Sequence, residues 1–251
     1  SFLNIDRALW AFAVNTVIGN FDSYNGYYVH NYYMYQNEDN LFQMIPWDLS
    51  QSFINALLGW DIFTPLGPTH PTQYDPYYGS DPTLFRPLTE FLFNNPVYRR
   101  QYTAHLRTVI NEIDTNQIRS EVQTMQAMAY SAMDNDIHKL FSSADYFNNV
   151  EQDISNLAWG GYGFGGIMSC LRHRIPFLLA HSEISATPPN IFNVQVDNGI
   201  ITANVNNESY VELMATVSEY NSKFKSFGMY DDGTNGDAQA NDGVYSCYAP
   251  F

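Results

Sequence analysis

The spacing of the apolar residues changes once along this 251-residue chain, at Pro188-Pro189. Before these prolines, the longer segments place apolar residues at helical intervals of three to four, apart from one hairpin-like pattern near the N-terminus. After them, apolar and polar residues alternate over short runs, as in strands. Helices followed by a run of strands predict an α+β protein. We expect a mostly helical domain over residues 1–184 and a small β-domain over residues 185–251.

The expected elements follow from these patterns. Ring-rich runs flank a turn signal at residues 37–40, which predicts a hairpin. Residues 55–83 have no period and are rich in Gly, Pro, Asp and Tyr, so we expect a long loop that shapes a site. Helices are predicted over residues 5–18, 87–93, 97–112, 115–130, 146–157 and 167–183. Strands are predicted over residues 30–35, 41–45, 191–196, 199–205, 210–220 and 244–248.

The charge of the chain limits its partners. The formal net charge is −15, and the chain has no cluster of cations. Nucleic acid is therefore not an expected partner, because binding its backbone requires clustered lysines and arginines. A divalent cation or a protein partner suits the acidic surface better. No apolar run approaches the roughly 20 residues of a membrane span, and the N-terminus shows no signal peptide, as in an already processed chain.

Asp22, Asn31 and Asp48 form the constellation that could carry chemistry. Asp22 follows the first predicted helix, Asn31 opens the predicted hairpin, and Asp48 follows its second strand. Phosphoryl transfer uses this order: one Asp orients the acceptor hydroxyl, while an Asn and a second Asp hold metal on the phosphates. The spacing alone leaves turn-capping and helix-capping roles open for the same residues.

Motifs around these residues resemble the CotH family of spore-coat and cell-surface proteins. The motifs are Gly19-Asn20-Phe21-Asp22, His30-Asn31-Tyr32-Tyr33-Met34-Tyr35 and Ile45-Pro46-Trp47-Asp48-Leu49. The last predicted helix is similar to the Arg-Ile-x-x-Leu end of that domain, through Leu171, Arg172, Arg174, Ile175 and Leu178. The resemblance covers roughly residues 1–184.

CotH proteins are similar to secretory-pathway protein kinases, so the resemblance implies a kinase-like lobe that uses ATP with Mg²⁺ or Mn²⁺ and phosphorylates Ser or Thr of a protein. It places Asp22 at the catalytic base, Asp48 at a metal and Asn31 as a further ligand of the metal and nucleotide. Ser50 stands where the family often has a second acid. No lysine of the chain fits the nucleotide-binding position of a kinase N-lobe, so we expect a fragment or a lobe that is inactive alone.

A second acidic constellation lies near the C-terminus. Asp231, Asp232, Asp237 and Asp242 alternate with glycines in one loop, a combination that suits Ca²⁺. The loop resembles a signature of Ig-like modules on secreted bacterial proteins, which implies an Ig-like β-sandwich and an extracellular or cell-surface location. A hairpin held by Asx turns explains the same residues without metal.

Two other functions remain open on the sequence. The chain could be a non-catalytic module that binds carbohydrate or protein through its Tyr-rich loop and β-domain. It could also be a glycosidase that uses Asp22 and Asp48 as its carboxylate pair. The six histidines lack metal-ligand spacing and are interpreted as structural. Cys170 and Cys247 could form one disulfide or remain reduced.

Overall fold

A computed structural model describes residues 2–54, 71–139, 141–155, 163–208, 210–217 and 224–250. The chain divides into two compact units. The larger contains Ile5–Tyr35 and Gln43–Ser185, and the smaller contains Ser1–Asn4, Gln36–Phe42 and Ala186–Phe251. Parts of three predicted segments lie outside the described residues: positions 55–70 of the long loop, 156–157 of a helix and 218–220 of a strand.

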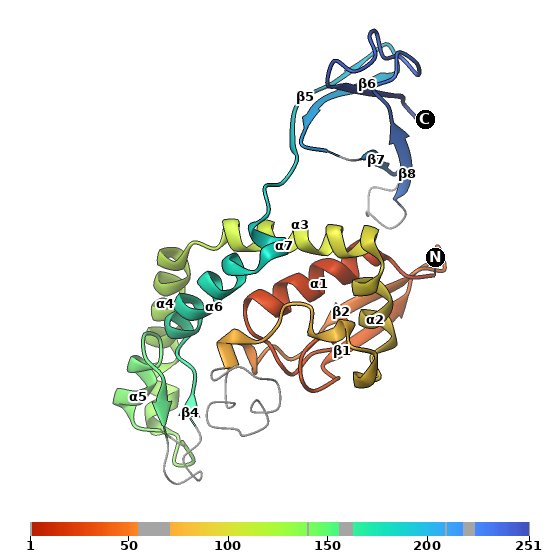
Figure 1. The fold of residues 1–251 in the computed structure, drawn as a ribbon. Helices are drawn as coiled ribbons and strands as arrows, with labels where there is room; N and C mark the ends of the chain where they lie inside the picture. The colour runs from red at the N-terminus through yellow and green to blue at the C-terminus, as the bar shows by residue number, and fades with distance from the viewer. Residues whose placement is uncertain are drawn as a thin grey trace. The chain divides into compact units, whose positions relative to one another are not determined.

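The larger unit is built around helix α1, Ile5–Val17. Its apolar residues recur at helical spacing, and Leu9 and Phe12 are completely buried. The helix ends before Gly19, whose φ of 63° is in the left-handed region that favours glycine. Figure 1 shows α1 lying along α3, Pro96–Glu112, and the two helices pack together. Thr16 of α1 and Tyr102 of α3 share a buried hydrogen bond of 2.7 Å.

The remaining helices mostly confirm the expected segments. Asn95 caps α3 and Asp114 caps α4, each accepting hydrogen bonds from the first turn of its helix. The other α-helices are α2 (Pro87–Asn94), α4 (Thr115–Asn135), α5 (Ser143–Asn148), α6 (Ile167–Ala180) and α7 (Ser182–Ser185). Short 3₁₀ helices lie at Ser52–Ile54, Pro71–Gln73, Tyr78–Ser80 and Pro82–Leu84.

The structure differs from the sequence expectation over residues 146–157. A capping box formed by Ser142 and Asp145 starts α5 earlier than expected. The helix ends at Asn148, and the next side chain, Asn149, donates a hydrogen bond to the carbonyl of Gln152. The chain then forms β3, Ile154–Ser155, which pairs antiparallel with β4, Gly163–Phe164. A polar side chain that bonds to nearby backbone has therefore ended the helix.

The expected hairpin is present as β1, Tyr32–Gln36, and β2, Phe42–Pro46. Its turn is closed by Asn37, whose Oδ1 accepts hydrogen bonds from the amides of Asp39 and Leu41. The hairpin leads from Asn31 to Trp47, so it places the two ends of the proposed site beside each other.

The smaller unit contains two antiparallel sheets. One has the order β5-β6-β9, from Asn190–Asp197, Ile200–Asn206 and Val244–Tyr248. The other pairs β7, Val211–Ala215, with β8, Lys225–Met229, a strand that the sequence did not predict. The strands share a core of Ala203, Val205, Val211, Met229 and Cys247. Helices first and small antiparallel sheets afterwards confirm the α+β class.

Candidate functional site

A closed loop follows α1 and carries Asp22. The amide of Tyr28 donates to the carbonyl of Phe21 at 2.9 Å, and the amide of Gly26 donates to the carbonyl of Ser23 at 3.0 Å. A Cβ on Gly26 would lie less than 3.0 Å from the backbone carbonyl of Phe21. The tight return of the chain therefore requires glycine at this position.

Buried side chains attach this loop to α1. Asn25, of which 5% is exposed, donates from Nδ2 to the carbonyl of Phe12 at 3.1 Å and to Thr16 Oγ1 at 2.9 Å. Ser23 Oγ donates to the carbonyl of Asn20 at 2.9 Å. Because buried polar groups are costly to leave unpaired, these bonds favour one loop conformation.

Asn31 and His30 both contact the carboxylate of Asp22. Asn31 Nδ2 donates to Asp22 Oδ2 at 2.8 Å. His30 Nδ1 lies 2.5 Å from Asp22 Oδ1, although that oxygen accepts no hydrogen bond from the part of the chain that is described. The side chain of Asp22 is 19% exposed, and its Oδ1 is buried. Asn31 has a φ of 56°, a left-handed conformation that Asn adopts more easily than most residues.

Asp48 lies across the hairpin from Asn31. The carbonyl of Asn31 accepts a hydrogen bond from the amide of Trp47 at 3.0 Å, so Asn31 connects the Asp22 loop to the Asp48 turn. Asp48 is exposed, and its Oδ1 accepts from the amide of Ser50 at 3.1 Å. Hydrogen bonds from Ser50, followed by the charge of His30, lower the pKa of Asp48. A lowered pKa keeps this carboxylate ionised at neutral pH.

The structure thus brings Asn31 into contact with Asp22 and places Asp48 one residue after the backbone bond between Asn31 and Trp47. A scan against protein-family models matches residues 1–157 to "CotH kinase protein". The chain belongs to the CotH kinase family. This match covers more than half of the chain and confirms the resemblance, but it ends before α6. Searches of curated proteins and of solved structures found no match.

His30 and Arg86 contact the Asp22 loop, and the sequence analysis assigned neither of them to the candidate site. His30 was interpreted as structural, although it directly precedes Asn31 and its charge affects Asp48. Arg86, just before α2, donates through both terminal nitrogens to carbonyls of the Asp22 loop. About 60 positions separate these partners, so no local pattern reveals the contact.

The acidic loop of the smaller unit gathers three of its four candidate ligands. Carboxylate oxygens of Asp231, Asp237 and Asp242 lie within 4.8 Å of one another. Short-range hydrogen bonds hold them, such as that from the amide of Gly233 to Asp237 Oδ2 at 2.6 Å. The carboxylate of Asp232 instead accepts from the amide and hydroxyl of Thr234.

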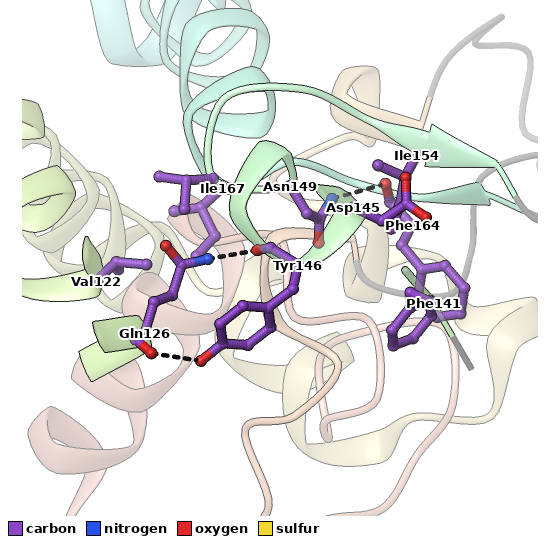
Figure 2. Close-up of a pocket in the computed structure, with 10 residues that line it drawn as sticks. Val122, Gln126, Phe141, Asp145, Tyr146, Asn149, Ile154, Phe164 and Ile167 are labelled. Carbon is purple, nitrogen blue, oxygen red and sulfur yellow. Dashed lines mark hydrogen bonds between the residues drawn. The ribbon is translucent and has the colours of Figure 1, made fainter. Parts of the chain in front are cut away.

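A cavity of about 320 Å³ lies among α4, α5, β3, β4 and the start of α6 (Figure 2). In its wall, the side chains of Gln126 and Tyr146 each donate a hydrogen bond to the other residue's backbone carbonyl. These two polar groups therefore connect α4 to α5. None of the proposed site residues lines this cavity.

Within the described ranges, no helix is both long and apolar enough to cross a membrane.

Proposed function

We propose that this site transfers the γ-phosphate of ATP to a Ser or Thr hydroxyl of a protein. The observation that carries the proposal is that Asn31 forms two hydrogen bonds. Its side chain donates to Asp22, and its carbonyl accepts from the amide of Trp47, the residue before Asp48. In this assignment, residues 1–184 act as the kinase-like lobe and residues 185–251 as an Ig-like module. CotH membership supports a kinase-like domain, and the acceptor and nucleotide are part of the proposal.

Asp22 takes the role of base at the acceptor hydroxyl. Asn31 occupies Oδ2 of the carboxylate and fixes its orientation. Oδ1 is assigned to the hydroxyl proton. This oxygen is buried beside the His30 ring, so His30, whose side chain is 59% exposed, would have to move aside for an acceptor to reach it.

Asp48 and Asn31 are the residues that would hold Mg²⁺ or Mn²⁺. The fit rests on donor chemistry: Asp48 is an exposed carboxylate with a lowered pKa, and Asn31 supplies a carboxamide oxygen. The ion, when bound, would neutralise charge on the phosphates. Ser50 donates to Asp48 and orients it, but it cannot provide a second carboxylate.

Transfer of labelled phosphate tests this function. The intact protein, which includes any N-lobe, is incubated with Mn²⁺, γ-labelled ATP and dephosphorylated casein as the acceptor, and incorporation into both proteins is measured. We expect Asp48→Ala to reduce incorporation at least a hundredfold, because transition-state charge would be left without its metal. Glu38→Ala, an exposed acid in the hairpin turn, serves as the control. Equal incorporation in Asp48→Ala and wild type would refute the assignment.

Exposed rings favour a second candidate function, a non-catalytic surface module that binds carbohydrate or protein. The side chains of Tyr33 and Trp47 are 56% and 57% exposed, with ring centroids 5.2 Å apart. Exposed rings of this kind can stack on a sugar or a partner. A glycan-binding screen that is uniformly negative would count against the carbohydrate form, and binding unaffected by Trp47→Ala would exclude this surface.

We also propose that the acidic loop binds Ca²⁺ outside the cell or at its surface. Asp231, Asp237 and Asp242 would supply the converging oxygens, and Asp232 is a fourth candidate. Extracellular calcium modules bind at about 10⁻⁴ to 10⁻³ M, which suits a loop with one oxygen from each of a few acids.

A further inference from the structure

Arg86 is a buried cation whose partners are carbonyl groups of the Asp22 loop. Only 4% of the residue is exposed, and it forms no ion pair within the described part of the chain. Nη1 donates to the carbonyl of Gly26, and Nη2 donates to the carbonyl of Tyr27 at 2.6 Å. The guanidinium carbon lies 4.9 Å from the centroid of the Tyr78 ring.

This arrangement specifically requires arginine. Burying a charge without a carboxylate is unfavourable unless hydrogen bonds and ring contacts compensate for the lost water. The planar guanidinium can donate to two neighbouring carbonyls at once, whereas an ammonium group on a flexible chain is a single point charge. Replacing Arg86 would leave the carbonyls of Gly26 and Tyr27 without these donors.

The hydrogen bonds from Arg86 restrain the loop Phe21–Tyr28 as a whole. Gly26 and Tyr27 precede Tyr28, whose amide bonds to the carbonyl of Phe21, and Phe21 directly precedes Asp22. The start of α2 provides another connection, because the amide of Leu88 donates to Tyr24 Oη at 3.2 Å. Fixing the far side of this closed loop therefore restrains the position of Asp22.

We propose that Arg86 is the positioning residue of the site, holding the loop Phe21–Tyr28 so that Asp22 keeps its carboxylate beside Asn31. It acts through Asp22 and does not itself contact the reacting atoms. The catalytic part of this proposal rests on the proposed function of Asp22.

A double-mutant cycle tests whether Arg86 acts through Asp22. Arg86→Gln, Asp22→Asn and the double variant are compared in the labelled-ATP assay, with Arg100→Gln on the exposed surface of α3 as the control. We expect Arg86→Gln to lower kcat tenfold to a hundredfold with little change in KM for ATP, since a small displacement of a catalytic group has effects of this size. Arg86→Lys should recover only a minor part of the rate. In the Asp22→Asn background, Arg86→Gln should cause no further loss, and a full additive loss would overturn the proposal.

Hydrogen exchange separates this role from a purely structural one and from failure of the proposed function. Arg86→Gln should speed exchange of the Gly26 and Tyr28 amides at least tenfold, while amides near Leu106 in α3 keep their wild-type rates. Equal acceleration in α3 would show that Arg86 only stabilises the domain. A wild type that transfers no phosphate would reject the kinase assignment, and unchanged exchange at Gly26 and Tyr28 would reject the restraint by Arg86.

Discussion

The two acidic loops that are proposed to be functional are held in different ways. The Asp22 loop is fixed by buried side chains from elsewhere in the chain, with Arg86 about 60 positions from its partner Gly26. The loop from Asp231 to Asp242 is fixed by partners close in sequence. Asp231 bonds no further along the chain than Gly243, 12 positions away, and Ser246 of β9 donates to the carbonyls of Thr234 and Asn235.

The difference bears on what each loop can do. A base must be held at one geometry relative to its substrate, which requires support from a rigid scaffold. Calcium accepts variable numbers and angles of oxygen ligands, so locally organised turns are sufficient. The Asp22 loop should consequently be sensitive to changes in the folded domain, and the acidic loop should respond to changes within itself.

Replacing one glycine in each loop should lower the free energy of unfolding by unequal amounts. Gly26→Ala should lower the free energy of unfolding by about 3 kcal/mol, because the new Cβ overlaps the backbone of Phe21, which has little room to move. Gly233→Ala should lower it by about 1 kcal/mol, because only the φ of 76° is unfavourable and a new Cβ would meet Ala240 at an ordinary contact distance of 3.7 Å. Urea denaturation measures both, and equal effects would contradict the proposed difference in support.

The two cysteines should affect how the free energy of unfolding depends on pH in alkaline solution. Burial raises the pKa of Cys170, which packs with Phe21, from 9.0 to about 12. The unfolded chain therefore loses this proton first, and the free energy of unfolding falls as the pH rises from 9 towards 12. This group should account for about 2 kcal/mol between pH 9 and pH 11.

Cys170→Ala should remove that contribution and flatten the pH dependence of stability. Cys247→Ala is the matched variant, since Cys247 is also a free cysteine whose pKa is raised by burial. Urea denaturation at pH 8, 9, 10 and 11 would detect the change. An unaltered slope in Cys170→Ala would show that its thiol does not remain protonated in the folded protein.

The acidic loop should give the smallest effect. Calcium at five times its Kd should stabilise the smaller unit by about 1 kcal/mol, and Asp237→Asn should abolish that gain. Differential scanning calorimetry with and without calcium measures the change, with Asp197→Asn in β5 as the control. Identical scans of the wild type with and without calcium would reject the metal site.

Local patterns predicted the regular elements well. The apolar spacing of α1 and the alternation of β9 follow directly from residues that are neighbours in sequence. The segment after α5 was harder, because Asn149 could continue a helix or end it by bonding to backbone. Strand β8 was missed because its sequence, from Lys225 to Met229, lacks a clear apolar alternation.

The candidate site was only partly predictable, because local patterns do not show contacts between residues that are distant in sequence. The motifs identified Asp22, Asn31 and Asp48, but their roles as base and ligands stay predictions. The support from Arg86 depends on a fold that joins distant segments. Similarly, His30 was not separable from a structural histidine until its contact with Asp22 was visible. Sequence pattern thus suggested the groups that are proposed to carry chemistry, and the fold was needed to find the residues in contact with them.

Phosphate transfer by Asp22→Asn tests the central claim most directly. The substitution retains the size of the side chain but removes the carboxylate that is proposed to take the hydroxyl proton. With Mn²⁺, labelled ATP and casein, we expect the rate to fall at least a hundredfold while the melting temperature stays near that of the wild type. A wild-type rate in Asp22→Asn would contradict the assignment of Asp22 as the base.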